Sequence, residues 1–370
     1  MGTFLSVIPI VVRRVAANGR LLTAIVIGAV LASALMSTTS IYTDTIRDLG
    51  LSYAIRTRGP EKVSFTIRSN SQSSVEDSYR SNQDFIQNAA KQAIGPLARA
   101  APANLGRSST FFPTAPGGAV PESEGRPRSH LQFVTSLQDH VKVVEGRLPG
   151  DAPAYAGGSA PSIEVAISRE VAATANVKVG DQFDLHPFWL PDVEPIHATV
   201  SGIIEQKDPH EVFWMGQTDL FVFPSTSWQT LPLFITEPAF FKTVSAYLPN
   251  MVSDYTTFLY LNTSPINARN ADSVRASLQG FERQVEGSLQ RVDASSELAN
   301  VLETFDQKLF FTRIPLLVLV LQIAGIVLYY LFMVSTMVVE RQTGEISLLK
   351  SRGATTAQVN ERSPGSVMPR

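Results

Sequence analysis

The feature that most constrains this chain is a long run of uncharged residues near its end. Residues 314–339 (IPLLVLVLQIAGIVLYYLFMVSTMVV) contain no charged side chain. An α-helix that crosses a bilayer needs about 20 consecutive apolar residues, and this run meets that length. The sequence therefore predicts a transmembrane helix over 314–339. The phrase ERQTGEISLLKSRGATTAQV follows it directly.

A second uncharged run, residues 21–43, predicts another transmembrane helix near the start of the chain. A cleaved signal peptide is the alternative for this run, because Ala32-Ser33-Ala34 resembles a cleavage site, but the basic region before it is unusually long. Residues 1–20 carry apolar side chains at helical spacing, which predicts an amphipathic helix on the inner membrane surface.

Basic residues determine the expected orientation of both runs. Those before the first run and after the second are Arg13, Arg14, Arg20, Arg341, Lys350 and Arg352. Cytoplasmic flanks of membrane helices carry an excess of Lys and Arg. We therefore expect a multi-pass protein of the cell (plasma) membrane, with both termini cytoplasmic and residues 44–312 forming an extracytoplasmic domain.

Composition and motifs exclude several classes of function. The 370 residues carry a net charge of −2, which gives no support for nucleic acid as a partner. There is no cysteine, so disulfides and thiolate metal sites are excluded. No lysine follows a glycine, so the chain lacks a P-loop, and HExxH and GxSxG are also absent. We expect no catalytic residue, no cofactor and no metal site in this chain.

The exterior segment shows strand and helix patterns rather than one loop. Residues 62–68 alternate like a strand, and residues 69–82 and 101–130 are typical of exposed loops. The pattern over about 131–225 is mostly β, with a short helix at 168–175. A further helix is expected over 75–94, and another carries Val274, Leu278, Phe281, Val285 and Leu289 on one face. The last expected helix of this segment forms a stalk over about 295–312 and begins at Ser295 or Ser296.

The fold class predicted from these patterns is a membrane protein. Two transmembrane α-helices flank a large two-lobed α+β extracytoplasmic domain, and a helical stalk leads from this domain into the second span. No internal repeat is visible.

Two polar groups of the exterior domain have alternative interpretations. The segment from Lys207 to Trp214 (KDPHEVFW) is either a metal or substrate site on Asp208, His210 and Glu211, or a turn after a strand whose aromatic residues pack on the domain. We favour the turn, because no second ligand cluster is visible. In VVEGRLPG, we expect Arg147 to pair within the domain.

The phrase after the second uncharged run is typical of a short cytoplasmic helix. Ile346 and Leu349 lie on one face of this helix, and Gly353 is suited to end it in the left-handed conformation. Such a helix over residues 340–354 can dock in a groove of a cytoplasmic partner. The alternative is an anchor that lies on lipid, which the nearby Glu340 and Glu345 disfavour.

This phrase resembles the signature of FtsX-like ABC transporter permeases of the MacB/LolC type. GEISLLKSRGATTAQV carries the resemblance, and the exterior phrases VVEGRLPG, IEVAISREVAATANVKVGDQFDL and ATVSGIIEQKDPHEVFW follow in the order of that family's MacB-like periplasmic core domain. The resemblance covers residues 5–359 and corresponds to the N-terminal half of such a permease.

The resemblance implies a mechanism of mechanotransmission rather than catalysis. A partner ABC-type ATPase hydrolyses ATP, and its closure moves the helix after the second span and, through the stalk, the exterior domain. It also implies a homodimer or a second permease chain in the lipid bilayer. By analogy, the residues that would couple the chain to the ATPase are Glu340, Arg341, Glu345, Ile346, Leu349, Arg352 and Gly353.

The chain departs from the family after Val359. Thr355-Thr356-Ala357-Gln358 fits a capping box that opens another helix, yet polar NERSPGSVMPR follows. We therefore expect residues 355–370 to be the truncated start of a third span with a disordered tail, and the chain to be a fragment of a permease. The alternative function is a two-span membrane receptor with an extracellular sensing domain; an enzyme with an exterior active site has no support in the residues.

Overall fold

The structure, a computed structural model, describes residues 45–99, 101–120, 127–217, 220–222 and 230–351, with the isolated positions 30, 33, 34 and 37. The chain divides into two compact units. One comprises Leu49–Phe305, and the other comprises Met1–Asp48 and Asp306–Arg370. Most described residues lie in the Leu49–Phe305 unit, called the α/β domain below. Apart from 30, 33, 34 and 37, the first predicted span, 21–43, lies outside the described residues.

The predicted fold class needs correction. Crossing a bilayer requires about 20 consecutive apolar residues in one helix. Within the part of the chain that the structure describes, no helix combines sufficient length with sufficient apolar character to do so. The expectation of a membrane protein with two transmembrane helices is therefore wrong for the described residues. The two-lobed exterior domain is corrected as well, because its strands join in one sheet within one compact unit.

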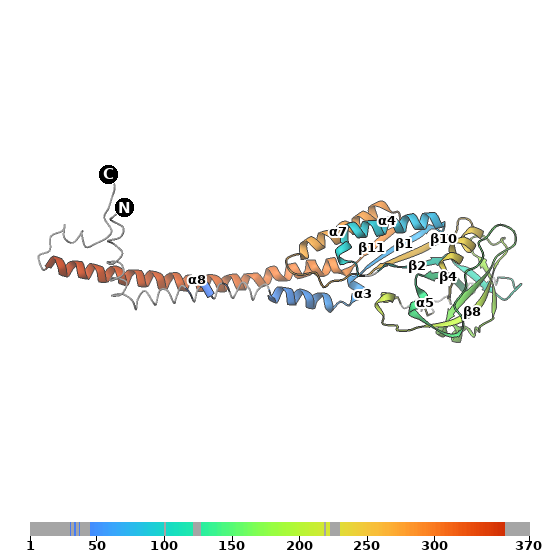
Figure 1. The fold of residues 1–370 in the computed structure, drawn as a ribbon, viewed down its shortest axis with the longest axis horizontal. Helices are drawn as coiled ribbons and strands as arrows, with labels where there is room; N and C mark the ends of the chain where they lie inside the picture. The colour runs from blue at the N-terminus through green and yellow to red at the C-terminus, as the bar shows by residue number, and fades with distance from the viewer. Residues whose placement is uncertain are drawn as a thin grey trace, which may run out of the picture. The chain divides into compact units, whose positions relative to one another are not determined.

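The α/β domain alternates short helices with strands along the chain (Figure 1). Residues 45–56 are helical. The helices are α3 (Pro60–Val63), α4 (Glu76–Ile94), η1 (Gly95–Leu97), α5 (Leu137–His140), α6 (Arg169–Ala175), η2 (Val212–Trp214), the π-helix η3 (Ala239–Ser245), α7 (Ala271–Ser288) and α8 (Glu297–Ser351). The strands are β1 (Phe65–Ser73), β2 (Ala103–Ser108), β3 (Phe111–Thr114), β4 (Arg128–Val134), β5 (Val141–Gly146), β6 (Ser162–Ser168), β7 (Gln182–Pro187), β8 (Ile196–Gln206), β9 (Thr230–Phe234), β10 (Val252–Leu259) and β11 (Val292–Ser295).

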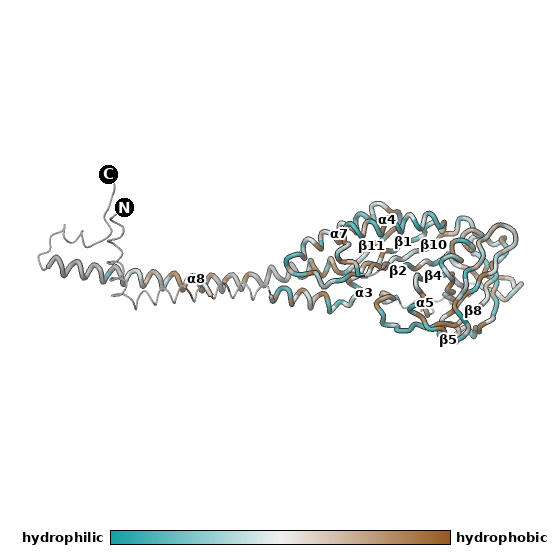
Figure 2. Tube along the Cα trace, in the orientation of Figure 1, coloured by the Kyte–Doolittle hydropathy of each residue, from teal (hydrophilic) through white to brown (hydrophobic). Residues whose placement is uncertain are grey.

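One half of the sheet is open and antiparallel, in the order β11–β1–β10–β2. Helices α4 and α7 lie side by side over these strands (Figure 1). Phe281 of α7 meets Phe65 of β1 edge to face, with ring centroids 5.0 Å apart, and both side chains are buried. Helix α4 is mostly hydrophilic along its trace (Figure 2), and its buried positions include Tyr79, Ile86 and Ile94, as expected for a helix with one face on a sheet and one in water.

The other half of the sheet closes on itself. Strand β4 continues the sheet from β2, and the pairings then run β4–β3–β7–β8–β6–β9 and return from β9 to β4. The link between β3 and β4 is the single pair Phe111–Ser129, and that between β6 and β9 is Ala166–Phe234. Closure of a sheet in this way removes exposed strand edges.

The core of the domain fills this closed ring and extends beneath the helices. Leu131, Phe133, Val165 and Leu185 project from the ring strands and are fully buried. They join Phe240 and Phe241 of η3 and Tyr79 of α4 in one apolar cluster. Burial of the Tyr255 hydroxyl, also in this cluster, raises its pKa to about 12. The ring and the helical half of the sheet therefore share one packed interior.

Several helices agree with the sequence patterns. The helix predicted over 75–94 is α4, and that predicted over 168–175 is α6, whose first turn is capped by Ser168: its Oγ accepts a hydrogen bond from Val171 N at 3.2 Å. The apolar face with Leu278, Phe281 and Val285 is buried in α7. At the start of α8, Ser296 Oγ accepts a hydrogen bond from Leu298 N, as predicted for a cap.

Other expectations were wrong. Residues 69–73 belong to β1 rather than to a loop. Residues 103–108 and 111–114, expected in a loop, are strands β2 and β3 because they pair with β10, β4 and β7, which are distant in sequence. Gly106 of β2 is needed there, since a Cβ would lie 2.1 Å from the Phe133 ring.

The helix expected over 340–354 is not separate. Helix α8 continues without a break from Glu297 through these positions to Ser351. Leu298, Val301, Leu302 and Phe305 are buried along one face of the first turns of α8, whereas the stalk itself stays a prediction. The remaining domain boundaries stay predictions.

Candidate functional site

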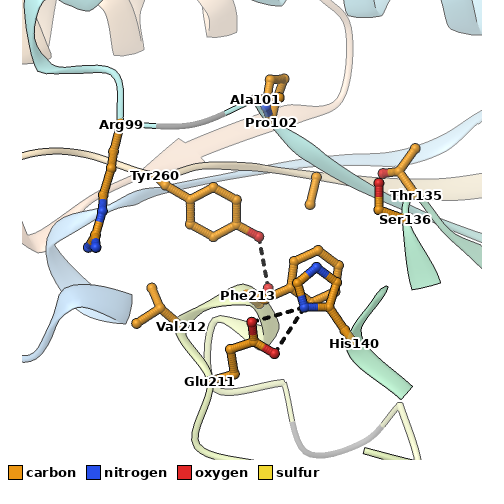
Figure 3. Close-up of a pocket in the computed structure, with 11 residues that line it drawn as sticks. Arg99, Ala101, Pro102, Thr135, Ser136, His140, Glu211, Val212, Phe213 and Tyr260 are labelled. Carbon is orange, nitrogen blue, oxygen red and sulfur yellow. Dashed lines mark hydrogen bonds and ion pairs between the residues drawn. The ribbon is translucent and has the colours of Figure 1, made fainter. Parts of the chain in front are cut away.

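A cleft of about 460 Å³ lies beside η2 in the described domain (Figure 3). The lining comes from three places in the chain: the segment before β2, the β4–α5 connection, and η2 with the turn before it. Tyr260, which follows β10, completes it. The lining residues are Arg99, Ala101, Pro102, Ala103, Thr135, Ser136, His140, Glu211, Val212, Phe213 and Tyr260.

The turn from Lys207 to Glu211 positions one wall of the cleft. Asp208 Oδ1 accepts a hydrogen bond from His210 N at 2.9 Å, which is a local side-chain turn. The carbonyl oxygen of Asp208 accepts another from the indole of Trp214 at 3.1 Å. Trp214 is buried in the second apolar cluster of the domain. The turn interpretation of this segment is therefore confirmed.

Asp208, His210 and Glu211 do not converge on one point. Asp208 holds the turn, whereas Glu211 contacts His140 from α5. Across the described ranges, no group of three or more His, Cys, Asp or Glu residues is arranged to hold a metal ion. The metal-site alternative for these three residues thus finds no geometric support.

The floor of the cleft is formed by His140, Glu211 and Phe213. His140 Nδ1 lies 2.9 Å from both carboxylate oxygens of Glu211. The imidazole also stacks on the Phe213 ring, with centroids 3.5 Å apart and planes 9° apart. Glu211 thus engages Nδ1 of the imidazole, and Nε2 is the ring nitrogen that this contact leaves unengaged.

The backbone secures α5 against the same turn. Lys207 N donates a hydrogen bond to the carbonyl oxygen of His140 at 2.9 Å, and Lys207 Nζ donates to the carbonyl oxygen of Asp139 at 2.8 Å. Ser136, just before α5, adopts the left-handed conformation with φ 58°. These contacts fix His140 relative to Glu211.

Tyr260 forms the opposite wall. Its hydroxyl donates a hydrogen bond to the carbonyl oxygen of Phe213 at 2.9 Å, which links β10 to η2 (Figure 3). Burial raises the pKa of Tyr260, and the negative charge of Glu211 adds to this effect. Tyr260 is therefore a neutral hydrogen-bond donor at physiological pH.

Most of this cleft could not be predicted from the sequence. The charged turn pointed to Glu211 and Phe213, but nothing pointed to His140, Arg99 or Tyr260. The aromatic pair Phe213-Trp214 after a charged turn was the only local signal, because no spacing in the sequence brings Tyr260 or His140 to it. The expectation that Arg147 pairs within the domain is confirmed: its Nη1 lies 2.6 Å from Glu164 Oε2.

The predicted coupling residues lie elsewhere. Glu340, Arg341, Glu345, Ile346 and Leu349 occupy positions within α8, whereas Arg352 and Gly353 lie outside the described residues. Their role in coupling stays a prediction.

The comparisons with known proteins assign no family to the chain. No family model matches it, and no curated protein matches it. The chain is similar to the crystal structure of the periplasmic region of MacB from Actinobacillus actinomycetemcomitans, at 10% identity and a TM-score of 0.31, over 68% of this chain and 94% of that one. A TM-score this low does not establish a shared fold, and the FtsX-like family remains a resemblance of sequence phrases.

Proposed function

We propose that this chain is a component of a MacB-type ABC transporter. In this proposal the α/β domain works on the extracytoplasmic side of the cell membrane, and a separate ATPase supplies the energy. In this proposal the chain itself does not hydrolyse ATP, since its sequence has no P-loop. A second copy or a second permease chain would complete the assembly.

The proposal rests on one observation, which is that the three exterior phrases lie next to one another in the fold. VVEGRLPG begins in β5, IEVAISREVAATANVKVGDQFDL covers β6, α6 and part of β7, and ATVSGIIEQKDPHEVFW covers β8 and η2. Strand β6 pairs along β8 in parallel, while β7 and β5 pair with β8 in antiparallel fashion. Phrases that are separated in sequence therefore form one module around β8, which supports reading them together.

Helix α8 supports the coupling part of the proposal. It is continuous from Glu297 in the α/β domain to Ser351, and it contains five of the seven proposed coupling residues. A helix is hydrogen-bonded along its whole length, so displacement of one part is passed on through its backbone. Mechanotransmission from an ATPase to the domain is thus the proposed mechanism, with Ile346 and Leu349 as the apolar contacts.

Association with an ATPase tests the proposal. The tagged full-length chain is purified from the cells that encode it, as wild type and as the double variant Ile346→Asp, Leu349→Asp. We expect a P-loop ATPase, identified by mass spectrometry, and its ATP hydrolysis to co-purify with the wild type and to be lost from the double variant. Charged side chains on the docking face of a helix oppose its burial in a groove.

Ser347→Asp provides the matched control. It adds one acidic side chain to the same segment, where the double variant adds two, at a position that a helix of about 3.6 residues per turn places away from Ile346 and Leu349. Circular dichroism confirms that all variants keep the folded domain. Equal recovery of the ATPase with the double variant would refute the coupling assignment, and no ATPase with any form would refute the transporter proposal.

A further inference from the structure

The cleft beside η2 is large enough and sufficiently apolar to hold a small molecule. Ligand sites are typically concave, with a volume of about 300–1,000 Å³ and a few placed polar groups among apolar walls. Here Pro102, Val212, Phe213 and Tyr260 provide apolar and aromatic surface in a cleft of about 460 Å³. A smaller pocket of about 230 Å³ adjoins it, because both are lined by Pro102 and Tyr260.

The charges around these two pockets are predominantly positive. Arg99 lines the cleft and Lys91 lines the adjoining pocket. Both are exposed, and within the part of the chain that the structure describes neither side chain has a hydrogen-bond or ion-pair partner. Glu211 is the acid among the lining residues, and it is engaged by His140 at 2.9 Å. The unengaged charge is therefore cationic, which favours an anionic ligand.

The polar groups also suggest how a ligand would lie. Figure 3 shows Arg99 and Tyr260 on one side of the cleft and Val212, Glu211 and Phe213 on the other. An aromatic body packed in the cleft against Tyr260, Val212 and Phe213 would bury apolar surface against rings that favour offset or edge contacts. A carboxylate on that body can then reach the Arg99 guanidinium, whose planar donors suit it.

We propose that the cleft lined by Tyr260 and η2 binds a small aromatic carboxylate. The aromatic body occupies the space lined by Pro102, Val212 and Phe213, and Arg99 pairs with the carboxylate, with Lys91 adding positive charge nearby. This binding site is independent of the transporter proposal, because it rests only on the geometry of the α/β domain.

Photolabelling of the purified full-length chain tests this site. The probe is 4-benzoylbenzoate, a photoreactive aromatic carboxylate, and its labelled positions are mapped by mass spectrometry. Two probes of nearly the same shape serve as comparisons: the neutral 4-benzoylbenzamide and the cationic 4-(aminomethyl)benzophenone. We expect labels in segments 99–103 and 211–213, with roughly five- to tenfold more from the carboxylate than from the amide, as one charge-assisted contact predicts, and least from the amine.

Variants separate a specific site from a merely apolar surface. Arg99→Gln removes the proposed partner without altering the core, since its side chain is exposed, and should reduce carboxylate labelling to the level of the amide. Val212→Asp should reduce it further by adding an acid to the wall. Lys178→Gln, which removes an exposed cation outside the cleft, should leave labelling unchanged. Equal labelling by the three probes, labels outside these segments, or no effect of Arg99→Gln would overturn the proposal.

Discussion

Gly146 of β5 lies opposite Gly202 of β8, and neither position has room for a side chain. A Cβ on Gly146 would lie 2.2 Å from the carbonyl oxygen of Ser201, and one on Gly202 would lie 2.1 Å from the carbonyl oxygen of Arg147. Gly146 also has φ 71°, a conformation that glycine adopts without strain. The two backbones therefore approach closely where two of the resembling phrases meet.

Gly202→Ala should destabilise the domain by about 1–3 kcal/mol, because backbone rather than a movable side chain blocks the added methyl group. Urea unfolding of the full-length chain measures the change. Gly280→Ala is the matched control: it lies within α7 with no atom near the added Cβ, so it should be stabilising by about 0.5–1 kcal/mol. Unfolding of both variants at the same urea concentration would contradict the close approach of the β5 and β8 backbones at Gly202.

His130 of β4 should make the domain sensitive to acid. Burial lowers its pKa to about 3, and the positive charge of Arg107 adds to this, despite the hydrogen bond with Gln132. In the unfolded chain a histidine has a pKa of about 6.5. Between about pH 3 and pH 6.5, His130 is therefore protonated in the unfolded state but not in the folded state. Stability from this group is complete above about pH 6.5 and is lost as the pH falls toward 3.

The variant His130→Gln checks this origin of acid sensitivity. Its free energy of unfolding should fall less steeply than that of the wild type between about pH 6.5 and 4, by on the order of 1 kcal/mol per pH unit. Urea unfolding at a series of pH values measures the slope, and His210→Gln, at an exposed position, is the control that should retain the wild-type slope. Parallel slopes for His130→Gln and the wild type would contradict a buried neutral His130.

Phe281 should be a principal contact between α7 and the sheet. Its side chain is fully buried and meets Phe65 edge to face. Phe281→Ala should destabilise the domain by about 3–5 kcal/mol, since it removes the buried ring and leaves a cavity. Val252→Ala, at an exposed strand position, should change the unfolding free energy by less than about 0.5 kcal/mol. Similar losses in both variants would place α7 elsewhere than on β1.

The pair of His140 and Glu211 should couple only modestly. The two side chains retain exposed fractions of 21% and 37%, and partly exposed ion pairs contribute about 0.2–1 kcal/mol. A double-mutant cycle with His140→Gln and Glu211→Gln, measured by urea unfolding near pH 6, should give a coupling energy in this range. A cycle with His140→Gln and the distant Glu164→Gln should give none, and a null result for both cycles would refute the contact.

Local patterns in the sequence determined several elements of this protein. The apolar spacing of Leu278, Phe281 and Val285 predicted α7, and the choice of Ser295 or Ser296 as a cap predicted the start of α8, because helical periodicity and capping depend on neighbours within a few residues. Strands β5 to β8 were predicted for the same reason, from alternation over short stretches. By contrast, the uncharged runs predicted membrane-spanning helices that the described structure does not contain.

Only the tertiary structure decided how these elements are joined. The strands β2 and β3 were mistaken for loops, since their partners lie far away in sequence and their glycine, proline and serine content resembles that of turns. The closed ring of strands and the cleft could not be predicted either, because both depend on contacts between distant segments. In the cleft, Tyr260 bonds to Phe213 and His140 to Glu211. Periodicity specifies which face of an element is buried, but contacts between distant segments depend on the packing of the whole domain.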